Sequence, residues 1–306
     1  MIHPDISSRT RTFLSIACML TFCVLCRVAD GQQAQTDATR LPTVNVSDQL
    51  NEEAPTGAYG APEWTGDRRF STTRVYLQQG PGEVGFEQWW RSRFYRDGTA
   101  ESKFMSEVEI GLPYRFQLDI YENWVTDENR HSSQDSVSFE LRYALADWGK
   151  IPLNPTIYAE YAVGTDPVND PDTIEVKLLL GQDLAPRWHY GLNFSCEQQV
   201  SGAHSTELLA AQGISYTLID QKLGVGFETE FIDTTRHGSR GNPSVEVNIG
   251  PSVQWRPTSW SHMDIVPLFG CTNDSPRIEA FVIFGLDFGP GKSSKEGYVP
   301  ASLNGH

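Results

Sequence analysis

The sequence has few cysteines and, beyond its first 31 residues, no long apolar run. Five cysteines occur in 306 residues, and three of them lie within residues 1–31. The remaining two, Cys196 and Cys271, are too few for a disulfide scaffold, and we expect them to be unpaired. No segment after residue 31 is apolar enough to form a transmembrane helix. A disulfide-stapled fold and a helical membrane protein are therefore both disfavoured.

Positive charge is also scarce. Lysine and arginine number 24 against 39 aspartates and glutamates, which gives a net charge of −15. Removing residues 1–31 takes away three arginines and two aspartates, and it leaves about −16. A chain with this charge lacks the general basic field that attracts nucleic acid or anionic lipid. We therefore expect no nucleic-acid partner.

Signatures of catalysis and of metal binding are missing as well. Neither a Gly-x-Ser-x-Gly nor a His-Glu-x-x-His pattern occurs. His204 lies near Ser201 and Ser205, but neighbouring serine and histidine in a loop are common by chance. The aspartates of GTDPVNDPD (164–172) lack the glycine and distal glutamate of a calcium loop, so a solvated turn is the simpler interpretation. We predict no enzyme activity, no metal and no cofactor.

The N-terminus has the features of an export signal. Arg9 and Arg11 precede an apolar run over residues 13–25, which is too short to span a bilayer. Small residues at 29–31 follow at the spacing of a cleavage site, so we predict a signal peptide over 1–31 that is cleaved after Gly31. Residues 32–80 are rich in Gln, Thr, Pro and acids and have few large apolar residues. This composition predicts a disordered periplasmic leader.

From residue 82 onward one rhythm dominates, in which segments of about ten residues alternate apolar and polar positions between turn signals. The predicted strands are 83–95, 99–111, 115–126, 135–146, 155–164, 173–183, 188–199, 205–218, 222–232, 243–255, 260–271 and 277–288. Convincing helical periodicity is absent from this region. An even number of similar strands predicts an all-β, up-and-down antiparallel barrel of about twelve strands over residues 81–288. Residues 289–306 are expected to form a flexible tail.

The alternation gives each strand two chemically different faces. In residues 136–145, SVSFELRYAL, Phe139 and Leu141 lie on one face, and Glu140 and Arg142 on the other. The apolar face could meet lipid, or it could line the core of a soluble sandwich or a lipocalin-like binder. Twelve strands enclose a lumen too wide for aliphatic side chains to fill, and ten-residue strands match a bilayer's apolar band. These two arguments favour a transmembrane barrel.

The connections between strands are asymmetric. Even-to-odd connections are mostly short (LPYR, LAPR, IDQK, RPTS), whereas odd-to-even connections such as DENRHSSQD and TTRHGSRGNP are longer. This asymmetry is typical of outer-membrane barrels. Four tryptophans lie beside the even-to-odd connections and are predicted to be interfacial aromatics: Trp148, Trp188, Trp255 and Trp260. We expect both termini to lie in the periplasm.

Five segments carry a resemblance to a known family: GEVGFEQWWRSRF, SEVEIGLPYRFQLDIYENW, EVKLLLGQDLAPRWHYGLN, SVEVNIGPSVQW and EAFVIFGLDF. With these segments the chain resembles a family of outer-membrane β-barrel proteins of Gram-negative bacteria that includes porin-like transporters. The resemblance covers most of residues 82–288. It implies a fold, a location in the outer membrane, and assembly by the barrel-assembly machinery. Because Phe288 is followed by an 18-residue tail, the chain departs from barrels that end on an aromatic residue.

On the membrane interpretation the polar faces line the lumen. The predicted lumen-lining residues are Glu107, Glu109, Asp119, Glu140, Arg142, Glu160, Glu175, Lys177, Glu228, Glu230 and Glu246. An acidic wall raises the local concentration of cations, so we predict a porin-like channel for small solutes with a mild preference for cations. Cross-strand ion pairs that only stabilise the wall are the simpler role for any single residue. A closed barrel used for structure or surface interaction, and a soluble secreted β-rich binding protein, remain as alternatives.

One pair of substitutions tests which face meets lipid. Leu141→Arg should lower the stability of the inserted barrel by about 2–4 kcal/mol if residue 141 lies at mid-membrane, because a charge would then face hydrocarbon. Glu140→Gln should have a mild effect. Equal losses of folded protein in the two variants, measured by urea unfolding in lipid vesicles, would contradict the assignment of faces.

Overall fold

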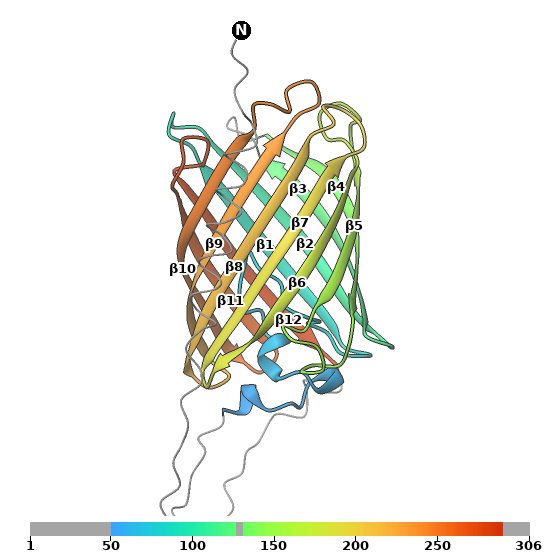
Figure 1. The fold of residues 1–306 in the computed structure, drawn as a ribbon, viewed down its shortest axis with the longest axis vertical. Coiled ribbons are helices and arrows are strands. Elements are labelled where there is room, and N and C mark those ends of the chain that lie inside the picture. Colours follow the sequence, from blue (N-terminus) through green and yellow to red (C-terminus); the bar gives the residue numbers. More distant parts are fainter. Residues whose placement is uncertain (1–49, 127–130, 290–306) are drawn as a thin grey trace, which may run out of the picture. The chain divides into compact units, whose positions relative to one another are not determined.

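The computed structural model describes residues 50–126 and 131–289. The predicted signal peptide, residues 32–49 of the predicted leader and the tail from residue 290 lie outside the described residues. Twelve antiparallel strands form a closed up-and-down barrel in which each strand pairs with its neighbours in sequence (Figure 1). The strands are β1 (Val84–Phe94), β2 (Ala100–Leu112), β3 (Phe116–Thr126), β4 (Ser132–Ala144), β5 (Thr156–Gly164), β6 (Thr173–Ala185), β7 (Trp188–Gln199), β8 (Thr206–Ile219), β9 (Leu223–Thr235), β10 (Ser244–Thr258), β11 (Ser261–Gly270) and β12 (Ile278–Phe288).

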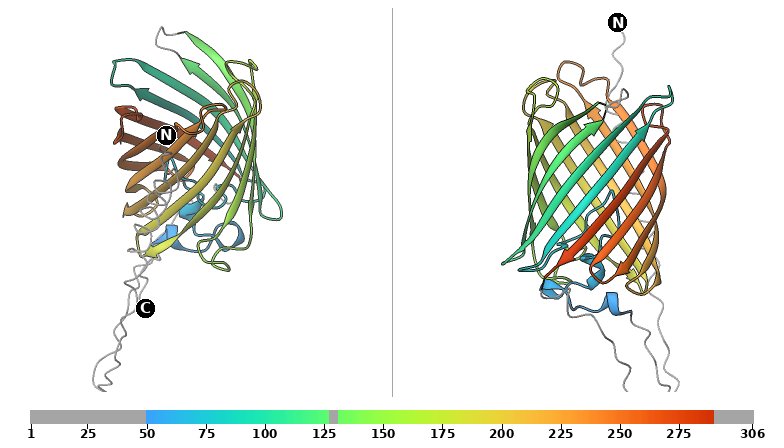
Figure 2. Two further views of the ribbon diagram at one scale, coloured as in Figure 1. Left: turned by 45° about the horizontal axis from the view of Figure 1, so that its top comes forward. Right: turned by 180° about the vertical axis from the view of Figure 1, so that it is seen from behind.

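Pairing of the first and last strands closes the barrel. β1 and β12 pair in unbroken register from Val84 opposite Phe288 to Phe94 opposite Ile278. They lie side by side in the right panel of Figure 2. Closure leaves no strand edge with unpaired backbone groups, which is the condition for a sheet in an apolar medium. The predicted fold class, a barrel of twelve strands, is therefore confirmed.

One ladder is interrupted where two prolines face each other. β10 and β11 pair from Asn248 to Ile249 and again from Val253, but not between these points. Pro251 of β10 and Pro267 of β11 stand in the gap, and neither has an N–H to donate. The gap is thus a local consequence of composition within an otherwise continuous wall.

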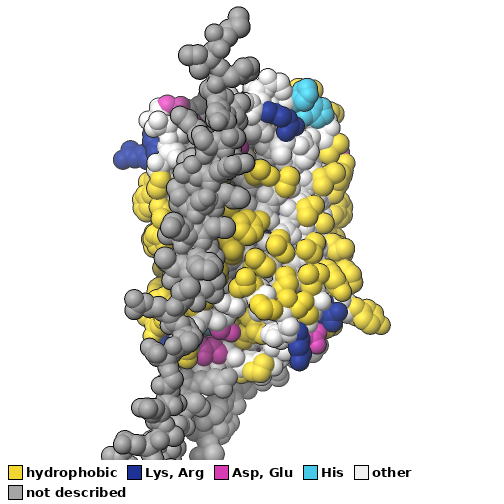
Figure 3. Space-filling model, viewed as in Figure 1, with side chains coloured by type: hydrophobic (Ala, Val, Ile, Leu, Met, Phe, Trp, Pro, Cys, Tyr) yellow, Lys and Arg dark blue, Asp and Glu magenta, His cyan; other side chains and the backbone are white. Residues whose placement is uncertain are grey.

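The outer face of the barrel is apolar. Phe139 and Leu141 of β4 are 47% and 43% exposed, whereas Glu140 between them is 1% exposed. Apolar side chains cover the visible outer surface in Figure 3, and the charged side chains gather toward the two ends. Leu141 stands three residues before the end of β4 at the short-turn end. The penalty for arginine at 141 should therefore fall toward the lower part of the range given above, and Phe139 lies nearer mid-strand.

Both ends of the barrel carry outward aromatic side chains. Trp188, Trp255 and Trp260 are exposed at the short-turn end, where the sequence places them. A second group, Trp90 opposite Phe104 and Phe104 opposite Trp124, lies toward the long-loop ends of β1, β2 and β3. Aromatic rings at both ends of an apolar band are typical of barrels that cross a bilayer.

Residues 50–80 differ from the prediction of a disordered leader. They form three short 3-10 helices, η1 (Asn51–Glu53), η2 (Ala58–Gly60) and η3 (Glu63–Thr65), followed by a loop that lies inside the barrel. We call residues 50–80 the plug segment. Most of its residues from Trp64 to Gly80 are buried. The composition of the segment did not predict this burial, because the inner wall supplies polar partners that a free leader would lack. None of the helices among the described residues is long and apolar enough to cross a membrane.

Cys196 and Cys271 are both exposed and unpaired, as expected. Cys196 lies on β7 and Cys271 follows β11, and three strands separate these two elements in the sheet.

Candidate functional site

The inner wall is lined by polar and charged side chains. Of the predicted lumen-lining residues, the structure buries Glu107, Glu109, Asp119, Glu140, Arg142, Glu228 and Glu230. Glu160, Glu175, Lys177 and Glu246 are half-buried on the same inner face. The structure brings the residues of β2, β3 and β4 together under the plug segment. It leaves Glu160, Glu175 and Lys177 farther toward the long-loop end.

The plug segment is fixed first to the turns at the short-turn end. Asp220, in the β8–β9 turn, accepts hydrogen bonds from the backbone N–H groups of Asn51 (2.8 Å) and Glu52 (3.2 Å). The N–H of Trp148, in the β4–β5 connection, donates to the carbonyl of Tyr59 (3.0 Å). These contacts satisfy backbone groups that the short helices leave free. They seat the helices across the end of the barrel (Figure 1).

Trp148 therefore has a different role from the one predicted. It is half-buried, and its ring packs edge-on against Trp64 (5.8 Å between centroids) and Tyr76 (5.4 Å) of the plug segment. The prediction of an interfacial aromatic fits the other three tryptophans by position, but Trp148 belongs to the packing of the plug segment. A tryptophan beside a turn gives the same sequence signal in both cases.

Arginines of the plug segment pair with carboxylates of the wall. Arg68 binds both oxygens of Glu87 on β1, through Nε at 2.7 Å and a terminal nitrogen at 2.5 Å. Arg256 on β10 reaches back to Asp67 (2.8 Å). The guanidinium of Arg68 also lies 4.5 Å from the ring centroid of Trp89. Bidentate pairs out of water combine charge with fixed geometry, so they hold the segment in one position.

Glu228 binds the backbone of the plug segment at its innermost turn. Its carboxylate accepts the N–H groups of Ser71 (3.0 and 3.1 Å) and Thr72 (2.8 Å) and the hydroxyl of Thr72 (2.7 Å). Buried backbone donors need partners, and a carboxylate can take several at once. A residue expected to line the lumen thus serves as an anchor for the segment.

Two amide side chains of the wall bind the segment in place of a paired strand. Asn193 on β7 accepts the N–H of Arg74 (2.6 Å) and donates to its carbonyl (2.7 Å). Gln117 on β3 accepts the N–H groups of Gln78 (2.8 Å) and Gln79 (3.1 Å). Polar side chains can satisfy backbone groups in both directions, so the segment needs no sheet of its own.

Three glycines of the wall form a shallow seat for the apolar part of the plug segment. Gly181, Gly191 and Gly213 lie directly opposite one another on β6, β7 and β8. A Cβ on Gly213 would lie 2.3 Å from Cδ1 of Phe70, and one on Gly181 would lie 2.3 Å from Cγ1 of Val75. Only glycine leaves room for these contacts. The row of glycines is therefore part of the site and has no role in a turn.

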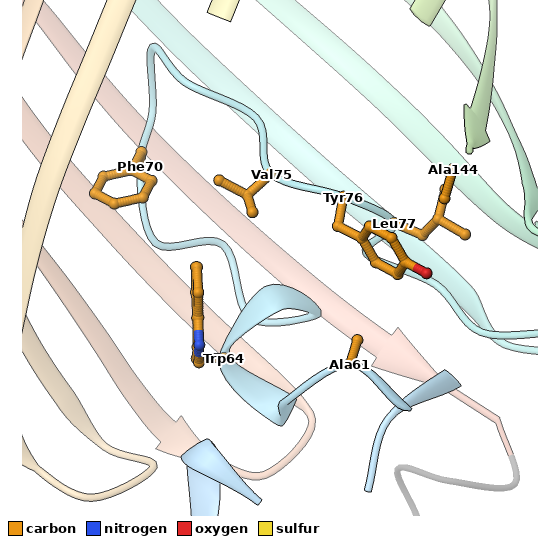
Figure 4. Close-up of a cluster of buried hydrophobic side chains, with 7 residues drawn as sticks. All are labelled: Ala61, Trp64, Phe70, Val75, Tyr76, Leu77 and Ala144. Carbon is orange, nitrogen blue, oxygen red and sulfur yellow. The ribbon is translucent and has the colours of Figure 1, made fainter. Parts of the chain in front are cut away.

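The apolar part of the segment packs as a small core (Figure 4). The buried residues of this core are Ala61, Trp64, Phe70, Val75, Tyr76, Leu77 and Ala144. Trp64 also stacks on His189 of β7, with ring centroids 4.6 Å apart. Burial of these rings stabilises the seated segment, since each large aromatic removes much apolar surface from water.

His189 links the segment's first helix to the wall. Its Nδ1 lies 2.8 Å from Asp183 and its Nε2 lies 3.3 Å from Glu52, which is fully buried. Burial raises the pKa of Glu52, but hydrogen bonds from His189 and Thr217 and the charge of Arg69 outweigh it and lower the pKa to about 2. The lone inward histidine of the sequence is thus a contact of the plug segment, and its Nε2 also lies 3.1 Å from the hydroxyl oxygen of Thr217 on β8.

The half of the lumen nearer the long loops carries a second charged network that sequence analysis partly missed. Arg91 and Arg93 of β1 pair with Glu279 of β12, and Arg93 also pairs with Glu246. Inward acids here outnumber bases, because Glu160, Glu175, Glu197 and Glu207 join Glu230. Glu279 was missed because β12 also carries Phe281 and Ile283 on its inner face, which hid the alternation.

Three arginines of the plug segment were also not identified from the sequence as residues of the site. Arg68, Arg69 and Arg74 stand within seven residues of a chain that is poor in positive charge. That local excess is a sequence signal for an acidic surface inside the same protein, but it names no particular carboxylate. Only the fold assigns Glu87 to Arg68.

Comparison with known proteins supplies no family for this chain. No protein-family model matches the sequence, and no curated protein matches it. Among solved structures, an outer-membrane channel from Pseudomonas putida F1 is similar over 70% of this chain and 98% of its own length, with 10% identity and a TM-score of 0.47. The NanC porin is similar over 68% of this chain and all of its own length, with 10% identity and a TM-score of 0.47. The KdgM porin is similar over 68% of this chain and 99% of its own length, with 9% identity and a TM-score of 0.41.

The glycine seat yields a prediction about release of the plug segment. Gly213→Val should force Phe70 from its place and speed tryptic cleavage within residues 50–80 roughly tenfold to hundredfold, because overpacking costs about 1–3 kcal/mol. Gly241→Val is the matched control, since a Cβ there meets nothing within 4 Å. Mass spectrometry of the fragments locates the cuts. Equal cleavage of the segment in both variants would contradict the seat.

Glu52 yields a prediction about pH. Its pKa of about 2 lies below the ordinary value of 4.5, so the stabilisation is present above pH 4.5 and is lost as pH falls toward 2. The difference corresponds to about 3 kcal/mol. Hydrogen exchange of residues 50–80, corrected for the intrinsic rate, should rise in the wild type between pH 5 and pH 3. In Glu52→Gln it should already be raised at pH 6 and depend less on pH. An unchanged profile in the variant would refute the assignment.

Proposed function

We propose that this protein is an outer-membrane channel for small solutes whose lumen is closed at one end by its own plug segment. The observation that carries the proposal is the chemistry of the interior. The inner wall is charged, and a separate segment is held against it through hydrogen bonds and ion pairs, as Arg68 is held by Glu87. A wall of this kind can exchange the segment for water, whereas an aliphatic core could not.

The outer face supports a place in a bilayer. Large apolar side chains on every strand are exposed, among them Phe139, Val176, Phe194, Phe227 and Ile265. A continuous apolar surface of this size on a soluble protein would drive aggregation. In a bilayer, the hydrocarbon chains of the lipids contact this surface and shield it from water. The strand lengths of 9–15 residues suit an apolar band of about 25 Å.

The balance of charge supports passage of cations over anions. With the plug segment in place, Arg68 and Arg74 offset the wall acids Glu87, Glu109 and Glu107. Withdrawal of the segment would remove these arginines and leave the acids facing water. The half nearer the long loops is already rich in acids. An acidic lumen concentrates cations and disfavours anions.

The orientation and assembly of the barrel follow from the same proposal. The plug segment enters from the short-turn end, which is the periplasmic end in outer-membrane barrels. Residues 1–31 would direct export as a cleaved signal, and the barrel-assembly machinery would insert the strands. Lipid, small solutes and this machinery are then the partners of the protein.

A closed structural barrel is the second candidate, and the filled short-turn end favours it. The plug segment makes contacts with β1, β3, β7 and β9, so it could be a permanent part of the wall. In that case the segment would stabilise the barrel and never leave. Conductance separates the two candidates.

The test uses planar bilayers with three proteins: the wild type, a variant lacking residues 50–79, and Gly213→Val. We expect brief or rare openings in the wild type and steady conductance that favours cations in both variants, because the obstacle is removed or loosened. Reversal potentials in a salt gradient give the selectivity.

Absence of conductance from folded barrels of both variants would refute the channel and leave the structural candidate. Conductance that favours anions would refute the role of the acidic wall. Recovery of the wild type in the soluble periplasmic fraction without detergent would refute the membrane location itself.

A further inference from the structure

The wall beneath the plug segment buries more negative than positive charge. Its carboxylates are those of Glu87, Glu107, Glu109, Asp119 and Glu140, and each is at most 2% exposed. Three guanidiniums lie among them, those of Arg68, Arg74 and Arg142. The five carboxylates therefore exceed the guanidiniums by two negative charges. His262 lies 3.3 Å from Glu87, but it does not reduce this excess because it also contacts the carboxylate of Asp264 (2.7 Å). Buried charge without compensation is costly, so either a bound cation or protons on the carboxylates must balance the cluster.

Glu107 is the acid whose carboxylate accepts no hydrogen bond. Its side chain is fully buried, and neither of its carboxylate oxygens has a hydrogen-bond partner among the described residues. The nearest cation is Arg74, at 3.6 Å, beyond hydrogen-bond range. Oε1 of Glu109 is also without a hydrogen bond. In contrast, Glu87 accepts two bonds from Arg68 and one from Trp89 (2.9 Å).

Three carboxylates of the wall lie close enough to share one ion. Carboxylate oxygens of Glu87, Glu107 and Glu109 lie within 4.8 Å of one another. Two ligands on opposite sides of a calcium ion are about 4.8 Å apart, because each Ca–O bond is about 2.4 Å long. Glu107 forms a second such group with Asp119 and Glu140, but Arg142 already binds both of those residues. The first group is therefore the one with oxygens to spare.

We propose that Glu107 and Glu109, with Glu87 beside them, bind one divalent cation of the calcium class. The donors are all carboxylate oxygens, which suit hard cations, and the group holds no histidine or cysteine that would favour zinc or copper. A charge of +2 closes the local balance. The ion sits in the wall formed by β1 and β2, next to Arg68 and Arg74 of the plug segment. The proposal is independent of whether solutes cross the barrel.

The experiment measures binding with a luminescent probe. Full-length mature protein, folded in the presence of EDTA and freed of it, is titrated with Tb³⁺, which takes oxygen ligands like those of calcium. Trp89 donates a hydrogen bond to Glu87, so its excitation should sensitise a bound ion. We expect saturable emission at one ion per chain, competed by Ca²⁺, and binding at least tenfold weaker in Glu107→Gln.

The matched control is Glu197→Gln, which removes an inward-facing carboxylate on β7, outside the cluster. It should bind as the wild type does. If Glu107→Gln fails to fold, Glu109→Gln takes its place with the same expectation. Metal analysis of wild type folded with Ca²⁺ and then desalted should give one calcium per chain.

Three outcomes overturn the proposal. Tb³⁺ emission that does not saturate, or that persists unchanged in Glu107→Gln, means that this cluster holds no ion. A wild type that retains no calcium and gains no thermal stability from it means that protons balance the charge instead. Equal weakening in the control means that the binding is a general property of the acidic lumen.

Discussion

Ion pairs and hydrogen bonds between the plug segment and the inner wall are the interactions on which the rest of this structure depends. A barrel with lipid-compatible side chains outside must direct its polar residues inward, and twelve strands enclose more space than side chains alone fill. Arg68 on Glu87, and the backbone of Ser71 on Glu228, fill part of that space with a chain of matching charge. The polar groups of the interior thus find hydrogen-bond and ion-pair partners, and the interior stays polar.

The same interactions limit how strongly the segment is held. Polar contacts gain less on formation than burial of apolar surface does, since water can replace each partner. The apolar core around Trp64 and the packing of Phe70 on the glycine seat contribute burial of apolar surface. A segment held in this mixed way is stable in place, and it can still exchange its polar contacts for water. That is the physical basis of the channel proposal and of its rival, the permanently closed barrel.

Glu140 belongs to a buried network of ion pairs and hydrogen bonds that includes the plug segment. Glu140 is buried and bonded to Arg142, which also pairs with Asp119 (2.9 Å) and donates to Gln78 of the plug segment (2.6 Å). Loss of the Glu140 carboxylate would disturb a shared network, so we expect Glu140→Gln to destabilise the barrel more than the strand pattern alone predicts. Glu197 is a better neutral reference for a substitution on the inner face.

The amino-acid sequence by itself determined the barrel, because alternation with a period of two acts within each strand and repeats twelve times. It also determined which faces are polar, as Glu140 beside Leu141 shows, and the unpaired state of Cys196 and Cys271. The tertiary structure alone decided where residues 50–80 lie, that Trp148 packs inward, and which acids meet the plug arginines. These features depend on contacts between residues up to 208 positions apart, such as Gln79 with Asp287. No local pattern encodes such distances, because the partner of a charge is chosen by the closure of the whole barrel.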